Sequence, residues 1–140
     1  MSKHIEENCI FCKIANGQIP TNSIYEDEDF KVIMDNSPAS HGHAIILPKN
    51  HAANLYELPE DDCTKIMSVA KKCATAMKKT LNCVGLNVLQ NNGELAGQTI
   101  FHLHVHLIPR YENDTVTIKS IPNDNPGDLS AVAEQIRKGF

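Results

Sequence analysis

The feature that most constrains the fold is the segment "FHLHVHLIPR" at residues 101–110, in which histidines alternate with apolar residues. Side chains alternate between the two faces of a strand, so His102, His104 and His106 would project from one face. Same-face neighbours lie roughly 7 Å apart at Cα, which lets the imidazoles converge on one small ligand but disfavours three bonds to one metal ion. The segment predicts a strand with an imidazole face that contacts a phosphate or a metal.

The size and charge of the chain limit what can surround this strand. The chain has 140 residues, of which 41% are hydrophobic, so we expect residues 1–140 to form a single domain with a substantial core. The formal net charge is −4 and no long basic run occurs, which argues against partners such as nucleic acid or an anionic membrane. A compact nucleotide needs only one pocket and stays possible.

The N-terminal segment and the cysteines indicate a reducing compartment. The segment "MSKHIEENCIFCKI" has the pattern of neither a secretory signal nor an anchor, and no later run approaches the ~20 apolar residues of a membrane span. Five cysteines are an odd number, better interpreted as thiols or metal ligands than as disulfides. We therefore expect a cytoplasmic protein.

Hydrophobic patterning predicts strands and two helices. Strand patterns occupy residues 23–35 as a hairpin, 43–49, 84–90 and 101–110, so two or three strands precede the first helix. Residues 63–81 follow the acidic "LPEDD" and carry apolar residues at three- and four-residue intervals, which predicts a long helix. Residues 127–140 predict a C-terminal helix beginning near Asp128 or Ser130. This order favours an α+β domain whose antiparallel sheet, of about five strands, is covered on one face by the long helix.

A row of imidazoles can carry out phosphoryl chemistry. Imidazole has a pKa of about 6.5, so a neutral ring can attack while a neighbouring protonated ring binds phosphate as a cation. Attack on phosphorus would give a covalent phosphohistidine-type intermediate. Backbone amides of the loop at residues 91–98 and the hydroxyl of Thr99 could bind the phosphoryl oxygens.

Three separate motifs resemble the histidine triad (HIT) superfamily of nucleotide hydrolases and transferases. "HLHVHLI" resembles its His-φ-His-φ-His-φ-φ signature, where φ is apolar, and "DNSPASHGHAIILPKNH" and "NNGELAGQTIFH" resemble two further blocks of the family. The resemblance covers residues 9–110 in the family's order, which leaves residues 111–140 as a C-terminal extension. The chain looks closest to the branch of histidine triad nucleotide-binding proteins, the protein kinase C inhibitor-like group.

The resemblance implies a HIT-like fold, usually a homodimer, that binds a purine nucleoside monophosphate or its conjugates and has no catalytic cofactor. Members cleave at the α-phosphate of adenosine phosphoramidates or, in the fragile histidine triad branch, of dinucleoside polyphosphates. By motif position His104 would be the nucleophile, His106 would contact the α-phosphate and His43 would complete the cluster.

The resemblance also implies further nucleotide contacts. These are Asp35 with the ribose hydroxyls, and Asn91, Gln98 and Thr99 with the phosphate. Asp35 and Asn91 also stand in contexts typical of turns, and that interpretation stays open. Glu94, Leu95 and the chain after Arg110 differ from the family's pattern or vary within it, so the leaving group is not defined by the motifs.

The pair "CIFC" has the spacing with which two thiolates bind one zinc ion, but a closed structural site needs four ligands. Relatives with this pair, and the related galactose-1-phosphate uridylyltransferases, complete the site with two histidines. That resemblance implies a structural zinc site formed by Cys9, Cys12, His51 and His102. A redox dithiol is the competing interpretation, disfavoured because the pair is not predicted to begin a helix in a β-α-β unit.

Two other classes of function stay open at this point. One is a zinc hydrolase in which two triad histidines and His43 hold a catalytic metal with an open water position. The other is a nucleotide sensor or interaction module that keeps the pocket but has little turnover. Activity that survives strong chelation would count against the zinc hydrolase. Partner binding that depends on nucleotide but survives loss of His104 would support the sensor or interaction module.

Overall fold

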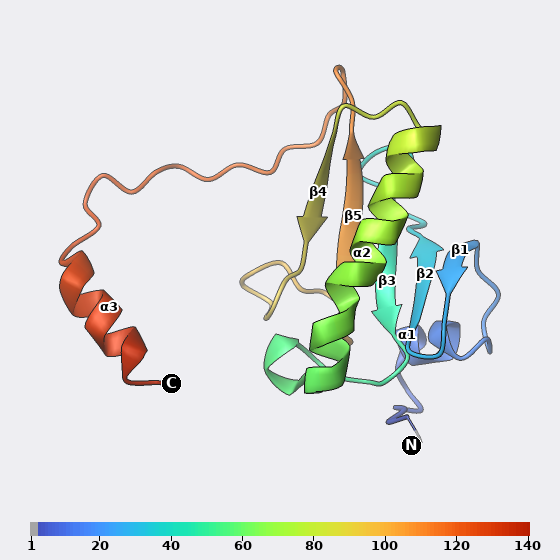
Figure 1. Cartoon of the computed structure of the whole chain (residues 1–140), viewed down its shortest axis with the longest axis horizontal. Helices are drawn as coiled ribbons and strands as arrows, with labels where there is room; N and C mark the ends of the chain where they lie inside the picture. Colours follow the sequence, from blue (N-terminus) through green and yellow to red (C-terminus); the bar gives the residue numbers. More distant parts are fainter. Residues whose placement is uncertain (1–2) are drawn as a thin grey trace.

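An antiparallel sheet of five strands organises the chain in the computed structural model, which describes residues 3–140 (Figure 1). In spatial order the strands are β1 (Ser23–Glu26), β2 (Phe30–Met34), β3 (Ala44–Pro48), β5 (Val105–Arg110) and β4 (Gly85–Leu89). Every neighbouring pair is antiparallel. The predicted α+β class and the hairpin within residues 23–35 are confirmed, and β1 and β4 are the two edges.

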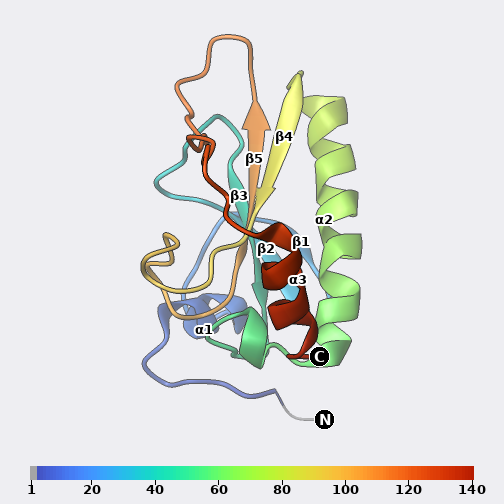
Figure 2. The same cartoon turned by 90° about the vertical axis from the view of Figure 1, so that its left-hand side faces the viewer.

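Helices lie on both faces of this sheet. The long helix α2 (Glu60–Thr80) covers one face, whereas α1 (Ile10–Ala15) lies on the opposite face (Figure 2). A short 3-10 helix, η1 (Leu55–Glu57), precedes α2, and α3 (Leu129–Arg137) stands apart from the sheet at the end of a long segment (Figure 1). None of the helices in residues 3–140 combines the length and apolar character needed to cross a membrane.

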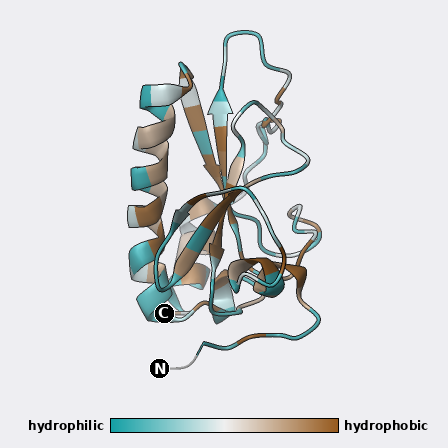
Figure 3. Cartoon of the chain, turned by 90° about the vertical axis from the view of Figure 1, so that its right-hand side faces the viewer, coloured by the Kyte–Doolittle hydropathy of each residue, from teal (hydrophilic) through white to brown (hydrophobic). Residues whose placement is uncertain are grey.

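Alternation along the central strands creates two apolar layers. Val32 and Ile46 are cross-strand partners that pack toward α2, whereas their neighbours Ile33 and Ile45 are partners in the cluster that includes Phe11 of α1. Figure 3 shows hydrophobic colour on the central strands and alternating bands on α2. Because both faces are covered, every residue of β3 is buried, and this strand is the centre of the core.

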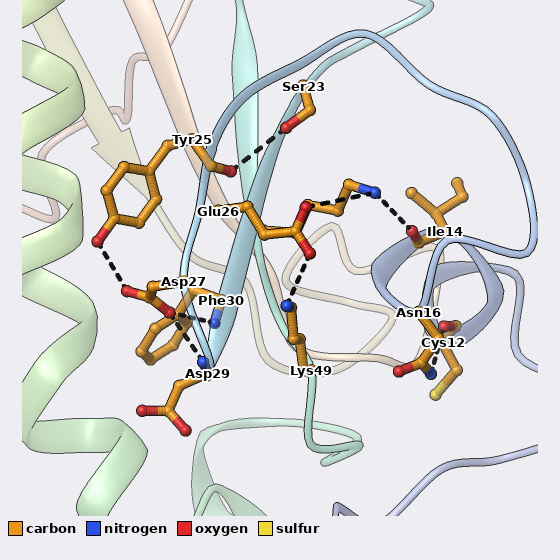
Figure 4. A network of polar contacts seen from close by, with 11 residues as sticks. Cys12, Ile14, Asn16, Ser23, Tyr25, Glu26, Asp27, Asp29, Phe30 and Lys49 are labelled. Atoms are coloured by element: carbon orange, nitrogen blue, oxygen red, sulfur yellow. Dashed lines mark hydrogen bonds and ion pairs between the residues drawn. The ribbon is translucent and has the colours of Figure 1, made fainter.

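Polar contacts fix the β1–β2 turn and attach α1 to the sheet (Figure 4). Asp27 Oδ1 accepts a hydrogen bond from the backbone N–H of Phe30 at 2.8 Å, and Asp27 Oδ2 accepts one from the Tyr25 hydroxyl at 2.7 Å. Lys31 Nζ donates to the carbonyl of Ile14 near the end of α1 at 3.3 Å. The hairpin and the N-terminal helix are therefore held in one fixed arrangement.

Two details of the sequence-based assignment are wrong. Helix α1 precedes every strand, and six residues are too few for hydrophobic periodicity to reveal a helix. Strand β5 begins only at Val105, where pairing with Ile46 starts, so His102 and His104 lie in the segment before the strand. Of the three motif histidines, His106 alone is part of the ladder, which frees the other two to take separate orientations.

Removal of the Ile46 side chain tests the position of the core. Ile46→Ala would leave a cavity between β3 and α2, and we expect the free energy of unfolding to fall by about 2–5 kcal/mol. Ile24→Ala on β1 is the control, because 48% of Ile24 is exposed, and its cost should stay below about 1 kcal/mol. Urea unfolding measures both, and equal costs would contradict this packing.

Candidate functional site

The four predicted metal ligands lie together beside the N-terminus of α1. Cys9 and Cys12 come from the start of α1, His51 follows β3 and His102 precedes β5, and their ligand atoms all lie within 4.8 Å of one another. The His102 Nδ1 atom is 3.4 Å from both sulfur atoms and 3.1 Å from His51 Nδ1. Bond lengths of about 2.0–2.3 Å place the ligands of tetrahedral zinc roughly 3.3–3.8 Å apart, so this cluster could hold a metal ion.

The surroundings prepare His102 and Cys12 for this role. His102 Nε2 lies 2.8 Å from the carbonyl oxygen of Pro48; because a carbonyl only accepts, Nε2 carries the proton and Nδ1 keeps its lone pair. Burial lowers the pKa of His102 to about 4 and raises the pKa of Cys12 to about 11. The imidazole is therefore neutral, as a ligand must be, and the buried thiol requires a nearby cation to ionise.

The position of the cysteine pair corrects one premise of the sequence analysis. Cys9 is the N-cap of α1, and its sulfur accepts the backbone N–H of Cys12 at 3.4 Å, so the pair does begin a helix. Within residues 3–140, no strand precedes α1 in the β-α-β manner of redox dithiols. Cys12 Sγ lies 3.3 Å from His51 Nδ1, and this contact favours metal binding over disulfide exchange.

The middle histidine of the motif has a defined free nitrogen. His104 Nδ1 lies 2.8 Å from the backbone carbonyl of His102 and must donate to it. The remaining nitrogen, Nε2, therefore carries the lone pair. The ring packs edge-on against Phe11 at 5.0 Å and against His106 at 4.9 Å between centroids. A contact with its own chain therefore fixes the orientation of the His104 ring and leaves Nε2 available, as the predicted nucleophile requires.

His43 and His106 form a second oriented pair. The backbone N–H of Ala39 donates to His43 Nδ1 at 2.9 Å, so the neutral ring of His43 carries its proton on Nε2. This Nε2 lies 3.0 Å from His106 Nδ1, which therefore accepts and leaves a proton on His106 Nε2. Asp35 Oδ2 lies 3.5 Å from the same His43 nitrogen. The chain of contacts leaves an N–H donor on His106, whose ring centroid lies 4.9 Å from that of His104.

The surroundings favour the neutral form of these imidazoles. Burial, together with smaller contributions from the adjacent His104 and His43, lowers the pKa of His106 to about 4. Burial also lowers the pKa of His43 and of His104, although Asp35 opposes the shift at both rings. The cationic phosphate clamp expected from the sequence is therefore absent among these described rings until an anion binds beside them, because a neighbouring negative charge favours protonation.

A cavity of about 380 Å³ opens directly onto these histidines. Asp35, Thr99, His104 and His106 line it, so four of the predicted site residues share one pocket. Its apolar wall was missed by the sequence analysis and consists of Ile10, Phe11, Ile14, Ile33, Ile45 and Ile100. The helical spacing of Ile10 and Ile14 was the available signal, but α1 had not been predicted. The pocket therefore has an apolar wall and a set of polar groups that include His104 and His106.

Comparison with known proteins agrees with this geometry. The HIT domain family matches residues 16–113. The chain belongs to the HIT family. A HIT family protein from Bacillus anthracis is 42% identical, with a TM-score of 0.89 over 96% of this chain and 98% of that one. The yeast Saccharomyces cerevisiae has a relative, adenosine 5'-monophosphoramidase HNT1, that is 39% identical over 84% of this chain and 72% of its own length.

A metal-containing member of the family has also been solved. A Zn-bound histidine triad family protein from Mycobacterium smegmatis is 32% identical to this HIT chain, with a TM-score of 0.75 over 95% of this chain and 98% of that one. Fold and family are thereby confirmed for this chain, whereas the roles assigned to individual site residues stay predictions.

Asn91 and Gln98, two of the residues expected to contact phosphate, are not among the described residues that line the cavity of this HIT chain. The buried amide of Gln98 accepts from the N–H of Gly93 at 2.8 Å and donates to the carbonyls of Ala53 at 2.6 Å and Ile100 at 3.1 Å. Among the described residues that line the cavity, Thr99 is included but Asn91 and Gln98 are not. Gln98 therefore holds the loop that presents Thr99, and direct phosphate contact by Asn91 or Gln98 stays a prediction.

Zinc content tests the metal cluster. We expect purified protein to contain one zinc ion per chain, and Cys12→Ser to lose most of it, because three remaining ligands cannot close a tetrahedral site. Elemental analysis with a thermal melt measures both metal content and stability. Cys83→Ser is the matched control, since Cys83 lies outside the cluster. Full zinc content in Cys12→Ser would exclude this site.

The pH dependence of stability tests the buried imidazole. The pKa of His106 is about 4 in the folded chain against about 6.5 unfolded, so between these pH values the unfolded state binds more protons. The free energy of unfolding should therefore fall as the pH falls from 6.5 toward 4. NMR titration of the His106 ring measures the pKa directly, and a midpoint near 6.5 would refute the burial argument.

Proposed function

We propose that this HIT chain hydrolyses purine nucleotide conjugates at the α-phosphate, with adenosine phosphoramidates as the substrate class and a nucleotidyl-histidine intermediate. The observation that carries the proposal is the 2.8 Å contact between His104 Nδ1 and the His102 carbonyl, which leaves His104 Nε2 free beside the His106 donor. The relative named adenosine 5'-monophosphoramidase supports the choice of substrate.

The first step transfers the nucleotidyl group to the protein. His104 Nε2 attacks the α-phosphorus, and the bond from phosphorus to the substrate nitrogen breaks. Because the anionic phosphate favours protonated His106, this ring can donate its Nε2 proton to the departing amine. After this step the His104 ring bears phosphorus on Nε2, and its Nδ1–H still donates to the His102 carbonyl. This hydrogen bond stabilises the positive charge on the ring.

The second step returns the protein to its starting state. A water molecule attacks the phosphorus from the side that the amine has left, and neutral His106 accepts one proton from it. The bond from phosphorus to His104 Nε2 breaks, and the nucleoside monophosphate departs. In the free protein His43 donates to His106 Nδ1, so we assign it as a positioning residue that sets the orientation of the proton-transferring ring before substrate binds.

The cavity supports a nucleoside monophosphate as the bound group. The apolar wall around Phe11 and Ile33 suits a flat base, and the Asp35 carboxylate at the same pocket suits the ribose hydroxyls. Thr99 lies near the histidines and can contact the phosphate. Because few polar side chains line the apolar wall, the pocket should select a purine by shape and stacking area more than by hydrogen bonds.

The metal, the assembly and the location belong to the same proposal. We assign zinc a structural role, because Cys9, Cys12, His51 and His102 would fill a tetrahedral site and leave no position for substrate. When bound, zinc would stabilise the segment whose carbonyl orients His104. The family resemblance supports a homodimer, and the free thiols and absence of predicted disulfides support a cytoplasmic location.

One alternative has an observation in its favour. Asp35, His43 and His106 also place ligand atoms within 4.8 Å of one another, as a catalytic zinc site would need. Metal binding there would break the 3.0 Å contact between His43 and His106, so we favour the covalent mechanism. Two further alternatives use the same pocket as the proposed hydrolase. Hydrolysis of dinucleoside polyphosphates differs from the proposed reaction only in its leaving group, and a nucleotide sensor would bind the same ligand with little turnover.

Turnover of adenosine 5'-phosphoramidate tests the proposal. We expect the wild type to release AMP and to accumulate an adenylyl adduct on quenching, visible by mass spectrometry. His104→Ala should reduce kcat by about three to six orders of magnitude, the range expected when a covalent nucleophile is removed. His41→Ala is the matched control, because His41 is exposed and does not line this cavity.

The outcomes separate the alternatives. AMP release that survives in His104→Ala but stops after chelation would support a catalytic metal at His43 and His106. Nucleotide binding without turnover or adduct would support the sensor. Faster cleavage of diadenosine polyphosphates than of the phosphoramidate would assign the other leaving group and keep the covalent mechanism.

A further inference from the structure

The loop at residues 35–43 connects β2 to β3 and carries polar groups of the candidate site at both ends. Asp35, at one end, lines the cavity beside His104, and His43, at the other end, contacts His106. The backbone N–H of Asp35 donates to the carbonyl of His43 at 3.0 Å, which brings the two ends of the loop together. The position of both side chains therefore depends on how the middle of this loop is held.

A tight turn closes the second half of the loop. The N–H of His43 donates to the carbonyl of Ser40 at 3.1 Å, and Gly42 has a φ of +88°, in the left-handed region that favours glycine. A Cβ atom at Gly42 would lie 2.5 Å from Cδ1 of Leu81 and 3.5 Å from Cγ of Pro109. The turn therefore packs closely against the end of α2 and against β5, and His43 is buried beneath it with 5% of its surface exposed.

Two hydroxyl groups attach this turn to the end of β5. The Ser40 hydroxyl donates to the carbonyl of Pro109 at 2.6 Å, and the Tyr111 hydroxyl donates to the carbonyl of His41 at 2.6 Å. Tyr111 is itself fixed, because its backbone N–H donates to Asp114 Oδ2 at 2.9 Å. Since β5 also carries the last histidine of the motif, these contacts hold the loop and that histidine in one arrangement.

The loop determines which nitrogen of His43 carries the proton. The N–H of Ala39 donates to His43 Nδ1 at 2.9 Å, so the neutral ring has its proton on Nε2 and donates it to His106 Nδ1 at 3.0 Å. Ala39 directly precedes Ser40 and His41, the two residues that the hydroxyl contacts attach to β5. If Ala39 moved away, His43 would be free to adopt the opposite tautomer, and His106 would then present a lone pair at Nε2 in place of an N–H group.

We propose that Tyr111 and Ser40 are positioning residues that fix the tautomers of His43 and His106 by holding the loop at residues 35–43. Neither is among the described residues that line the cavity of the candidate site, so both act through the backbone of the loop. Their effect on turnover rests on the proposed function, in which His106 donates its Nε2 proton to the departing amine.

The charges that face His106 stay the same when either hydroxyl is removed. The described titratable groups that act on this ring are His43, His104 and Asp35. Tyr111 and Ser40 are not among them, so a change in the tautomer of His106 in their variants reports the geometry of the loop.

The ¹⁵N chemical shifts of the imidazole nitrogens test the assignment in the full-length protein without substrate. In the wild type at neutral pH we expect the proton on Nε2 of both His43 and His106. Tyr111→Phe and Ser40→Ala each remove one hydroxyl and keep the rest of the side chain, and we expect each variant to show a mixture of tautomers at both rings. The mixture should be largest in S40A/Y111F. Ring nitrogen shifts that are unchanged in all three variants would overturn the proposal.

Two matched controls remove the same hydroxyls elsewhere. Tyr56 is 88% exposed and Ser68 is an exposed residue of α2, and both lie outside the loop and the described lining of the cavity. We expect Tyr56→Phe and Ser68→Ala to keep the ring nitrogen shifts of the wild type. Equal changes in the controls and in Tyr111→Phe would contradict a specific role of the loop contacts.

Turnover of adenosine 5'-phosphoramidate gives the second measurement. We expect Tyr111→Phe to lower kcat by about three- to tenfold, as for loss of one orienting hydrogen bond, with KM changed by less than about twofold because the cavity lining is intact. A raised KM with kcat unchanged would overturn the positioning role. If the wild type showed no turnover, the proposed hydrolase would fail, and the tautomers of His43 and His106 would still decide whether Tyr111 and Ser40 position these rings.

Discussion

The contacts of His102 connect the cluster of cysteines and histidines, the sheet and the proposed nucleophile. Its Nε2 donates to the carbonyl of Pro48 at the end of β3, its Nδ1 faces the two cysteine sulfurs, and its own carbonyl orients His104. The residue is fully buried, so these hydrogen bonds do not compete with water. Through it, the N-terminal cysteines can affect a ring that they do not touch. Position and protonation of His104 therefore depend on how well this one residue is held.

Burial of the histidines suits the phosphate chemistry that we propose for this pocket. An exposed imidazole is partly protonated near neutral pH, which removes the lone pair needed for attack. In this fold, burial against Phe11 and neighbouring rings lowers the pKa of His104 and His106, which leaves a lone pair on each ring. In the proposed mechanism, the negative charge of the substrate then favours protonation of His106. Under that proposal, positive charge develops in the pocket only when substrate is bound.

The two faces of the sheet differ in what they carry: one carries the main apolar core and the other carries the candidate site. On one face, α2 buries a continuous apolar core that includes Val32 and Ile46. On the other face, α1 is short; the cysteines at its start belong to the cluster that could hold a metal, and its side forms part of the apolar wall of the cavity. A rigid central strand, β3, is shared by both faces, so the side chains of the pocket are carried on the best-packed part of the fold.

By itself, the sequence determined the α+β class, the long helix, most strands and the residues that form the metal and histidine clusters. The periodicity of apolar residues and the spacing within a motif are local properties of the sequence. The three motifs that resemble those of the HIT family are short, so they can be recognised without the tertiary structure. Only the tertiary structure decided that α1 forms an apolar wall, that Gln98 is engaged by Gly93 and Ala53, and that burial lowers the pKa of His106. These properties depend on burial and on contacts between residues distant in the chain, and neither a pKa shift nor a pocket wall exists until packing brings those residues together.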